Sequence, residues 1–254
     1  MPDAPTRSRA PITVALHGFT QTGRSWRHLT AAAARTGDVV LAPNLPGHGA
    51  ASNERPVDLG AAAALIVARV EPALGGRPAR WVGYSLGGRV LLHLALARPE
   101  LVSELVLVST TAGIDDANER AERRRADNAL ADRIDRIGTK AFVTEWLDQP
   151  LFASLPFDPD DIADRARNDA AGLASSLRTC GAGTQTPVWS RLIELTMPTL
   201  VVTGSQDTKF TALGRRLAKL LDNSEHAEID DAGHACHLEK PETFAALLGY
   251  ESTA

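Results

Sequence analysis

The sequence predicts an α/β fold built on a mostly parallel, doubly wound sheet into which a helical segment is inserted. Short apolar runs recur along the chain with longer helix-like stretches between them. Near-continuous apolar strands are typical of a parallel sheet that is covered on both faces. The alternation stops between about residues 112 and 196, where only charged, helix-like segments follow one another.

The order of the expected elements supports this fold. Strands are expected at 12–16, 39–41, 80–82, 105–108, 199–203 and 227–229. Helices are expected between them at 26–34, 59–70, 87–97 and 210–220, as in repeated βαβ units. Four further helices are expected at 118–137, 140–146, 159–168 and 170–180. We therefore expect a core of residues 1–111 and 197–254, and a helical cap of residues 112–196, where specificity is often built.

Composition argues against nucleic-acid binding and membrane insertion. The chain has 254 residues and a net charge of −4, so it has no general basic field for a nucleic acid. The longest apolar run, around Val90–Ala97, is too short for membrane insertion. No signal peptide is evident, and Cys180 and Cys236 are expected to be free thiols. We expect a cytoplasmic protein whose oligomeric state the sequence leaves open.

The strongest local motif is Gly83-Tyr84-Ser85-Leu86-Gly87-Gly88, which matches G-x-S-x-G between an expected strand and an expected helix. A nucleophilic serine on such a tight turn stands clear of the sheet. Glycines on both sides leave space where side chains would clash. The motif predicts a nucleophile elbow and, with it, the α/β-hydrolase fold, with Ser85 as the catalytic serine.

A catalytic serine needs an imidazole, and the imidazole needs a carboxylate that fixes its tautomer. In this fold the order along the chain is serine, acid, histidine. Asp207 follows the strand at 199–203, and His234 follows the strand at 227–229. Both therefore lie at carboxyl ends of strands, where this architecture places its sites. We predict a catalytic triad of Ser85, Asp207 and His234.

Alternatives exist for the last two positions. Asp207 could serve only as the N-cap of the helix that contains Phe210. Asp230 or Asp231 could be the acid, although both are very near His234 and fit a turn better. His237 is the rival histidine, but Gly233 before His234 suits a loop tip.

An oxyanion hole should use two backbone N–H groups. One belongs to Leu86, directly after the serine, and the other is expected at Phe19 in the loop His17-Gly18-Phe19. His17 and His48 are expected to hold loops by hydrogen bonds. With His28 and His226 they show no ligand spacing, so we expect no metal, and no motif implies a cofactor.

Several motifs occur together along most of the chain. They are Leu16–Phe19, Leu45–Gly49, Gly83–Arg89, Glu119–Arg123, Trp146 with Gln149–Leu155, Arg167-Asn168, Gly181–Gln185, Asp207–Phe210 and Ala232–His234. The set resembles the 2-succinyl-6-hydroxy-2,4-cyclohexadiene-1-carboxylate synthases of menaquinone biosynthesis. The loop and elbow pieces are widespread among α/β-hydrolases. Gly-Gly-Arg after the elbow and the cap motifs are much more specific.

The resemblance implies an elimination rather than a hydrolysis. Members of this family remove pyruvate from 2-succinyl-5-enolpyruvyl-6-hydroxy-3-cyclohexene-1-carboxylate. By this resemblance, Ser85 is the base, activated by His234 and Asp207, and takes a ring proton beside a carboxylate-bearing carbon. The enolpyruvyl group then leaves as pyruvate, and no acyl-enzyme is needed.

The substrate so implied bears three carboxylates and needs cations. The positions that match the family supply Arg89, Arg123 and Arg167, and Arg binds a carboxylate bidentately. Tyr84 and Trp146 match positions that line the pocket and donate hydrogen bonds to it.

Each of these positions has a simpler interpretation. Arg89 could lie on the helix surface, and the run Arg123-Arg124-Arg125 could be a solvated face. Arg167 could pair with Asp164 or Asp169, and Trp146 could be a core residue of the cap. Lys209 and Gln149 remain possible supporting groups.

Two rival functions follow. An esterase, thioesterase or carbon–carbon hydrolase could use the same triad through an acyl-enzyme, but a neutral ester needs no cationic pocket. A non-catalytic receptor for a small acid is the second rival, and the intact triad argues against it. The partner expected from the resemblance is a small tricarboxylate substrate.

Overall fold

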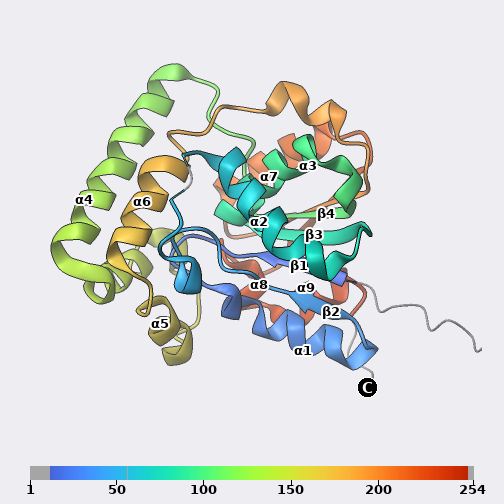
Figure 1. Ribbon diagram of the computed structural model, residues 1–254, viewed down its shortest axis with the longest axis horizontal. Coiled ribbons are helices and arrows are strands. Elements are labelled where there is room, and N and C mark those ends of the chain that lie inside the picture. Colours follow the sequence, from blue (N-terminus) through green and yellow to red (C-terminus); the bar gives the residue numbers. More distant parts are fainter. Residues whose placement is uncertain (1–11, 56, 251–254) are drawn as a thin grey trace, which may run out of the picture.

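Six parallel strands form the sheet of the protein. The computed structural model describes residues 12–55 and 57–250. The strand order is β2-β1-β3-β4-β5-β6, and each neighbouring pair is parallel (Figure 1). The strands are β1 (Ile12–Leu16), β2 (Val39–Leu41), β3 (Ala79–Tyr84), β4 (Val102–Val108), β5 (Thr199–Gly204) and β6 (Ser224–Ile229). The predicted α/β fold is confirmed.

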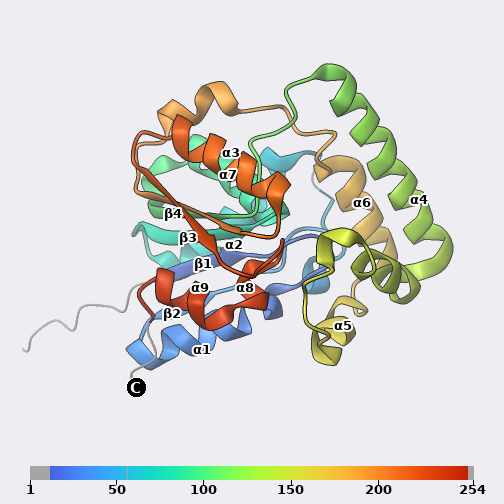
Figure 2. The same cartoon turned by 180° about the vertical axis from the view of Figure 1, so that it is seen from behind.

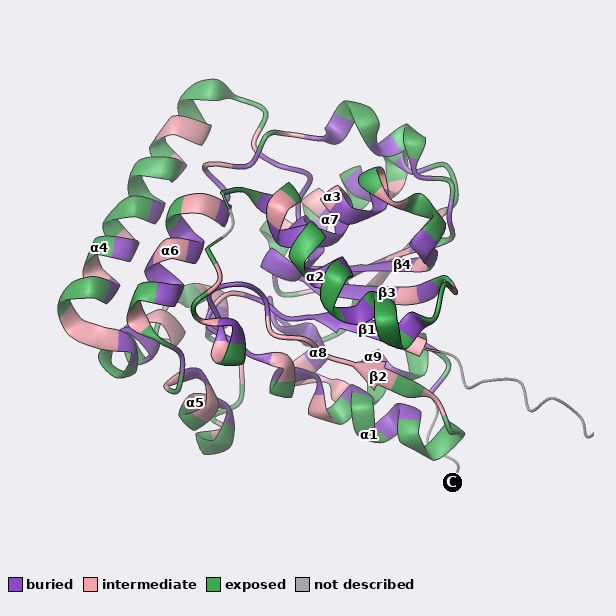
Figure 3. Ribbon diagram, in the orientation of Figure 1, coloured by how far each residue is buried: buried purple, intermediate pink, exposed green. Residues whose placement is uncertain are grey.

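Helices cover both faces of this sheet. The longer ones in the core are α1 (Arg27–Thr36), α2 (Leu59–Leu74), α3 (Leu86–Ala97) and α7 (Thr208–Leu220), and α8 (Cys236–Glu239) and α9 (Pro241–Leu247) are short. Side chains alternate along a strand, so Leu105 and Leu107 join the apolar cluster of α2 and α3. Val106 and Val108 join the cluster that contains residues of α1 and α9. Figure 2 shows α1 and α9 side by side, and Figure 3 colours most of the central strands as buried. The central strands are buried on both sides, as their apolar runs predicted.

The chain leaves the sheet after β4 and returns at β5. Between them lie α4 (Ala117–Leu147), α5 (Pro159–Arg165) and α6 (Ala170–Cys180). Figure 1 shows these helices side by side at one end of the sheet. A separate apolar cluster joins α4 to α6 through Ile134, Phe142 and Leu173. The insertion thus has a small core of its own, placed beside the carboxyl ends of the strands.

Several boundaries differ from those expected, and a glycine marks two of the differences. The two helices expected before and after Gly138 are a single element, α4, broken at that residue, whose φ of 75° and ψ of 166° only glycine adopts readily. α2 runs past Pro72 to Leu74 and ends at Gly75 in the left-handed region, four residues later than expected. α5 ends at Arg165, three residues earlier than expected.

Short 3-10 turns connect several of these elements. They are Gly23–Trp26, Gly49–Ala51, Pro99–Leu101, Pro150–Phe152 and Trp189–Glu194. None of the helices in the described part of the chain combines the length and apolar character that a bilayer crossing requires.

Candidate active site

Ser85 lies on a strained turn between β3 and α3. Its φ of 50° and ψ of −105° are unusual for a residue with a side chain. Its N–H donates to the carbonyl of Val108 at 2.9 Å. A Cβ on Gly83 would lie 2.7 Å from the Gly87 carbonyl group, and one on Gly87 would lie 2.2 Å from the Leu16 carbonyl oxygen. Both glycines are therefore required by close backbone contacts, which hold the Ser85 side chain in place.

A hydrogen-bonded chain joins Ser85 to two residues from distant parts of the sequence. His234 Nε2 lies 3.3 Å from Ser85 Oγ, and His234 Nδ1 lies 2.7 Å from Asp207 Oδ2. Because a carboxylate only accepts, the Nδ1–H of His234 donates to Asp207, and Nε2 is left to accept the hydroxyl proton of Ser85. The arrangement can take a proton from the serine and hold it as an imidazolium.

Asp207 also caps α7, because its Oδ1 accepts from the Phe210 N–H at 3.1 Å. The capping role considered from the sequence therefore coexists with the bond to His234. Asp230 and Asp231 are both exposed. The alternative acids thus lie away from the buried imidazole.

His237, the rival histidine, is buried against aromatic rings. Its ring centroid lies 4.4 Å from that of Tyr84 and 4.6 Å from that of Trp26. Burial lowers its pKa well below the usual value, and the nearby Arg165 and His234 act in the same direction. Neither ring nitrogen of His237 has a hydrogen-bond partner among the described residues. Its ring therefore packs against Tyr84 and Trp26 and does not line the cavity at Ser85.

Two further buried histidines hold the loops around the elbow. Leu45 N–H donates to His17 Nε2 at 2.9 Å, so His17 Nδ1–H donates to the Gly18 carbonyl at 2.8 Å. His48 Nδ1 donates to the Pro46 carbonyl at 3.1 Å. Burial lowers the pKa of His48 to about 4, and burial, followed by the neighbouring His48, lowers that of His17. Both loops therefore depend on neutral imidazoles.

This dependence predicts a loss of stability in acid. The ordinary histidine pKa is near 6.5, and that of His48 in the fold is about 4. As the pH falls through this window, the unfolded chain binds protons that the folded chain does not, so stability present above pH 6.5 is lost. Each such histidine should contribute a slope of about 1.4 kcal/mol per pH unit. Urea unfolding between pH 7 and pH 4.5 measures it. His48→Asn should reduce the slope, and an unchanged slope would contradict the assignment.

Leu86 and Phe19, the two residues expected to supply an oxyanion hole, both line the cavity at Ser85. Leu86 is the first residue of α3, so its N–H has no partner within the helix. Phe19 lies in the loop after β1 and lines the cavity at Ser85. Gly18 N–H donates to Gln21 Oε1 at 2.8 Å, and a Cβ on Gly18 would lie 2.5 Å from the Tyr84 ring. This packing fixes the loop that carries the Phe19 N–H.

A cavity of about 150 Å³ lies between Ser85 and the inserted helices. Its walls come from the elbow, the loop after β1, α4, α5, α6 and the start of α7. The side chains that decide its chemistry are Tyr84, Ser85, Arg89, Arg123, Trp146, Phe152, Arg165, Lys209 and His234. Apolar rings and cations therefore surround the serine together.

Arg89 and Arg123 reach the cavity from different elements, α3 and α4. Arg89 is buried on α3, one turn after Ser85, and its Nη1 donates to the Cys180 carbonyl at 2.7 Å. Burial, followed by the charge of Arg123, lowers the pKa of Arg89 to about 10. Arg123 donates from Nε to Asp127 at 2.7 Å, whereas Arg124 and Arg125 are exposed. Of the run of three, Arg123 faces the cavity.

The third arginine at this cavity is Arg165, not Arg167. Arg167, two residues further along the chain, is exposed and does not line it. The side chain of Arg165 is only 2% exposed. It donates from Nε to Asp161 at 2.6 Å and from Nη1 to Thr20 at 2.7 Å. Its Nη2 has no hydrogen-bond partner among the described residues, so one donor remains for a ligand.

Aromatic side chains form the rest of the wall. Trp146 lies 5.1 Å from Phe19 and 5.9 Å from Phe142, measured between ring centroids. It therefore packs in the cap and lines the cavity at once, and its Nε1–H has no partner among the described residues. Tyr84 is buried beside His234, and burial raises its pKa. Phe152, which the sequence did not single out, lies 6.1 Å from His234.

A second cavity of about 400 Å³ adjoins the first at Ser85, Arg89 and Arg123. Lys209 lines both, and its ammonium lies 5.9 Å from the centre of the Phe210 ring. Gln149 lines neither and donates to the Trp146 carbonyl at 3.1 Å.

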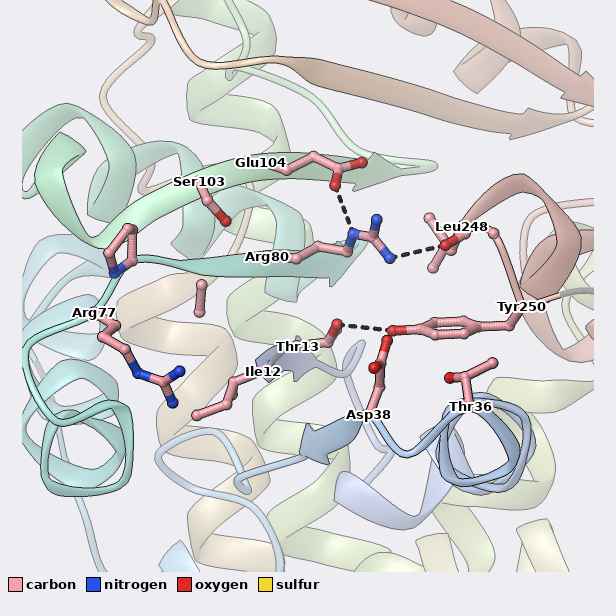
Figure 4. A pocket seen from close by; sticks show the side chains of 13 residues that line it. Ile12, Thr13, Thr36, Asp38, Arg77, Arg80, Ser103, Glu104, Leu248 and Tyr250 are labelled. Carbon is pink, nitrogen blue, oxygen red and sulfur yellow. Dashed lines mark hydrogen bonds and ion pairs between the residues drawn. The ribbon is translucent and has the colours of Figure 1, made fainter. Parts of the chain in front are cut away.

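Another cavity, of about 510 Å³, lies at the amino ends of β1, β3 and β4, away from Ser85 (Figure 4). There Arg80 bonds Glu104 at 2.6 Å, and Thr13 bonds Tyr250. In the part of the chain that is described, no group of three or more potential metal ligands occurs.

Comparisons with known proteins agree with this geometry. The profile of the Alpha/beta hydrolase family matches residues 13–247. A 2-succinyl-6-hydroxy-2,4-cyclohexadiene-1-carboxylate synthase from Serratia proteamaculans is 31% identical, with 94% of this chain and 91% of that protein covered. A relative from Bacillus subtilis, provisionally given the same name, is 35% identical over 97% of this chain and 91% of its own. This chain belongs to that synthase family, within the α/β-hydrolases.

A solved structure of the family has the same fold. MenH from S. aureus superposes with a TM-score of 0.88 at 30% identity, over 96% of this chain and 94% of the other. The likeness thus includes the inserted helices as well as the sheet.

Proposed function

We propose that this enzyme is a synthase of menaquinone biosynthesis that eliminates pyruvate from 2-succinyl-5-enolpyruvyl-6-hydroxy-3-cyclohexene-1-carboxylate. The product is 2-succinyl-6-hydroxy-2,4-cyclohexadiene-1-carboxylate. The observation that carries the proposal is the cationic wall around Ser85, formed by Arg89, Arg123 and Arg165. A neutral ester would offer no carboxylate to the guanidinium N–H groups that face the cavity, and buried donors left without an acceptor cost free energy. A substrate with three carboxylates matches them.

In the proposed reaction the triad moves one proton. Ser85 Oγ takes a proton from a ring carbon while its own hydroxyl proton passes to His234, whose imidazolium Asp207 stabilises. A ring C=C bond forms as the C–O bond to the enolpyruvyl group breaks. The proton held by His234 returns to Ser85, and the ring proton is passed on to the departing enolpyruvate, which becomes pyruvate. The atoms of the substrate equal those of the two products, so no water is consumed.

The surrounding groups have assigned parts in this proposal. The N–H groups of Phe19 and Leu86 stabilise negative charge that develops on an oxygen of the substrate. Tyr84 and Trp146 orient the substrate. We propose that residues 112–196 act as the cap that closes over it. The cytoplasmic location and the absence of a nucleic-acid partner remain predictions from the sequence.

Substitution of one cation tests the proposal against an esterase. Arg89→Met should lower kcat/KM for pyruvate release by about 10- to 150-fold, because a charged hydrogen bond contributes about 1.5–3 kcal/mol. Hydrolysis of a neutral aryl ester, if wild type has it, should fall much less. Arg191→Met, an exposed arginine paired with Glu194, is the matched control. Equal losses on both substrates would speak for a hydrolase instead.

A further inference from the structure

One buried carboxylate near the proposed site touches neither the triad nor the cavity. Asp127 lies on α4, and its side chain is 1% exposed. A buried carboxylate is costly unless charged or polar donors compensate it. Asp127 has two such donors: Arg123 Nε at 2.7 Å from Oδ1, and the N–H of Gly183 at 3.0 Å from Oδ2.

The first of these bonds sets the direction of a guanidinium. Arg123 is 40% exposed, and a free arginine of this kind samples many rotamers. Asp127 occupies its Nε edge, four residues along the helix. Arg123 makes no other side-chain hydrogen bond to a described residue, and it lines both cavities at Ser85. Asp127 thus holds the guanidinium of Arg123 through Nε and leaves the edge formed by its two Nη groups for a carboxylate of a ligand.

The second bond ties the same carboxylate to the loop after α6. A Cβ on Gly181 would lie 2.5 Å from Asp127 Oδ2, and one on Gly183 would lie 2.1 Å from the Arg124 nitrogen. The loop therefore packs directly on α4. Arg89 donates to the Cys180 carbonyl at the start of this loop, from the core side. Asp127 and the loop thus connect the two arginines that face Ser85.

Charge balance gives Asp127 a further effect. Arg89 has no acidic partner within 4.0 Å among the described residues, and the charge of Arg123 acts with burial to lower its pKa. The charge of Asp127 opposes that reduction. Two cations can face the same ligand only if their mutual repulsion is offset, and Asp127 is the carboxylate placed to do this.

We propose that Asp127 is a positioning residue, which orients Arg123 toward a carboxylate of the substrate and sets its spacing from Arg89. The inference rests on the proposed function. It assigns Asp127 no contact with substrate, so most of its effect should pass through Arg123.

A double-mutant cycle on pyruvate release tests this. Asp127→Asn should raise KM by about ten- to a hundredfold, with kcat changed much less. In an Arg123→Ala background its effect on KM should be much smaller, since interacting residues are not additive. Arg123→Lys keeps the charge and the Asp127–Gly183 bond but lacks the fork, and it should raise KM similarly. Asp132→Asn is the control, an exposed aspartate of α4 that pairs with Arg178.

Binding separates this idea from loss of folding and from failure of the proposed function. In calorimetric titrations, the double variant Ser85→Ala with Asp127→Asn should bind the substrate more weakly than Ser85→Ala alone, at a temperature where both are folded. A KM effect of the same size with and without Arg123, or an unchanged KM, would overturn the role of Asp127 alone. Wild-type protein that neither binds the substrate nor releases pyruvate would overturn the proposed function and this inference together.

Discussion

Ser85→Ala should reduce kcat for pyruvate release by about 10²- to 10⁴-fold, the contribution usual for a positioned acid or base. Ser85 Oγ is the atom that His234 Nε2 approaches at 3.3 Å, and no other hydroxyl of the cavity wall has such a bond to His234. Substrate affinity should change little, because the arginines are untouched. Steady-state pyruvate release and calorimetric binding measure the two effects separately.

A neighbouring serine supplies the control for this loss. Ser205 follows β5, and its Oγ accepts from the Asp231 N–H at 3.1 Å without touching the triad. Ser205→Ala should keep its activity and unfold at a similar temperature. If Ser85→Ala retained most of its kcat, His234 or a bound water would have to be the base.

Arg165→Ala should cause the largest combined loss of stability and activity. The substitution leaves the Asp161 carboxylate, whose side chain is 10% exposed, without its cation. Breaking a buried ion pair in this way costs about 3–5 kcal/mol of unfolding free energy. It also removes the unpartnered Nη2 from the cavity, so KM for the tricarboxylate should rise. Urea unfolding and pyruvate kinetics measure the two losses.

Two further variants separate those losses. Asp161→Ala combined with Arg165→Ala removes both charges and should recover part of the stability but none of the affinity. Arg167→Ala alters an exposed arginine two residues away and should affect neither. A larger loss of affinity in Arg167→Ala than in Arg165→Ala would contradict the assignment of Arg165 as the third arginine of the cavity.

The arginines also mark the limit of what the sequence could predict. Strands and helices were found because apolar runs and helical periods are local patterns, and the sheet was predicted on that basis. Whether a cap arginine points inward depends on how its helix packs against the core. We expected α5 to continue to 168, but it ends at Arg165, whose side chain lines the cavity. The spacing of Asp161 and Arg165, an i,i+4 pair, was the one signal in the sequence that could have indicated Arg165.

Other features depend on contacts between distant segments. The sequence could not show whether Asp207 caps α7, bonds to His234 or does both. The structure contains both bonds. His237 packs against Tyr84, and Asp127 accepts a hydrogen bond from Gly183. Both contacts join residues far apart in the chain. No local periodicity encodes these contacts.

The most direct test of the central claim follows both products and the enzyme in a single reaction. Wild-type protein is mixed with the enolpyruvyl substrate, and pyruvate, the absorbance of the conjugated diene and the mass of the intact protein are recorded together. We expect one pyruvate for each diene, formed at the same rate, with no adduct on Ser85. Absence of pyruvate and diene, together with cleavage of aryl esters and an acyl adduct on Ser85, would contradict the elimination.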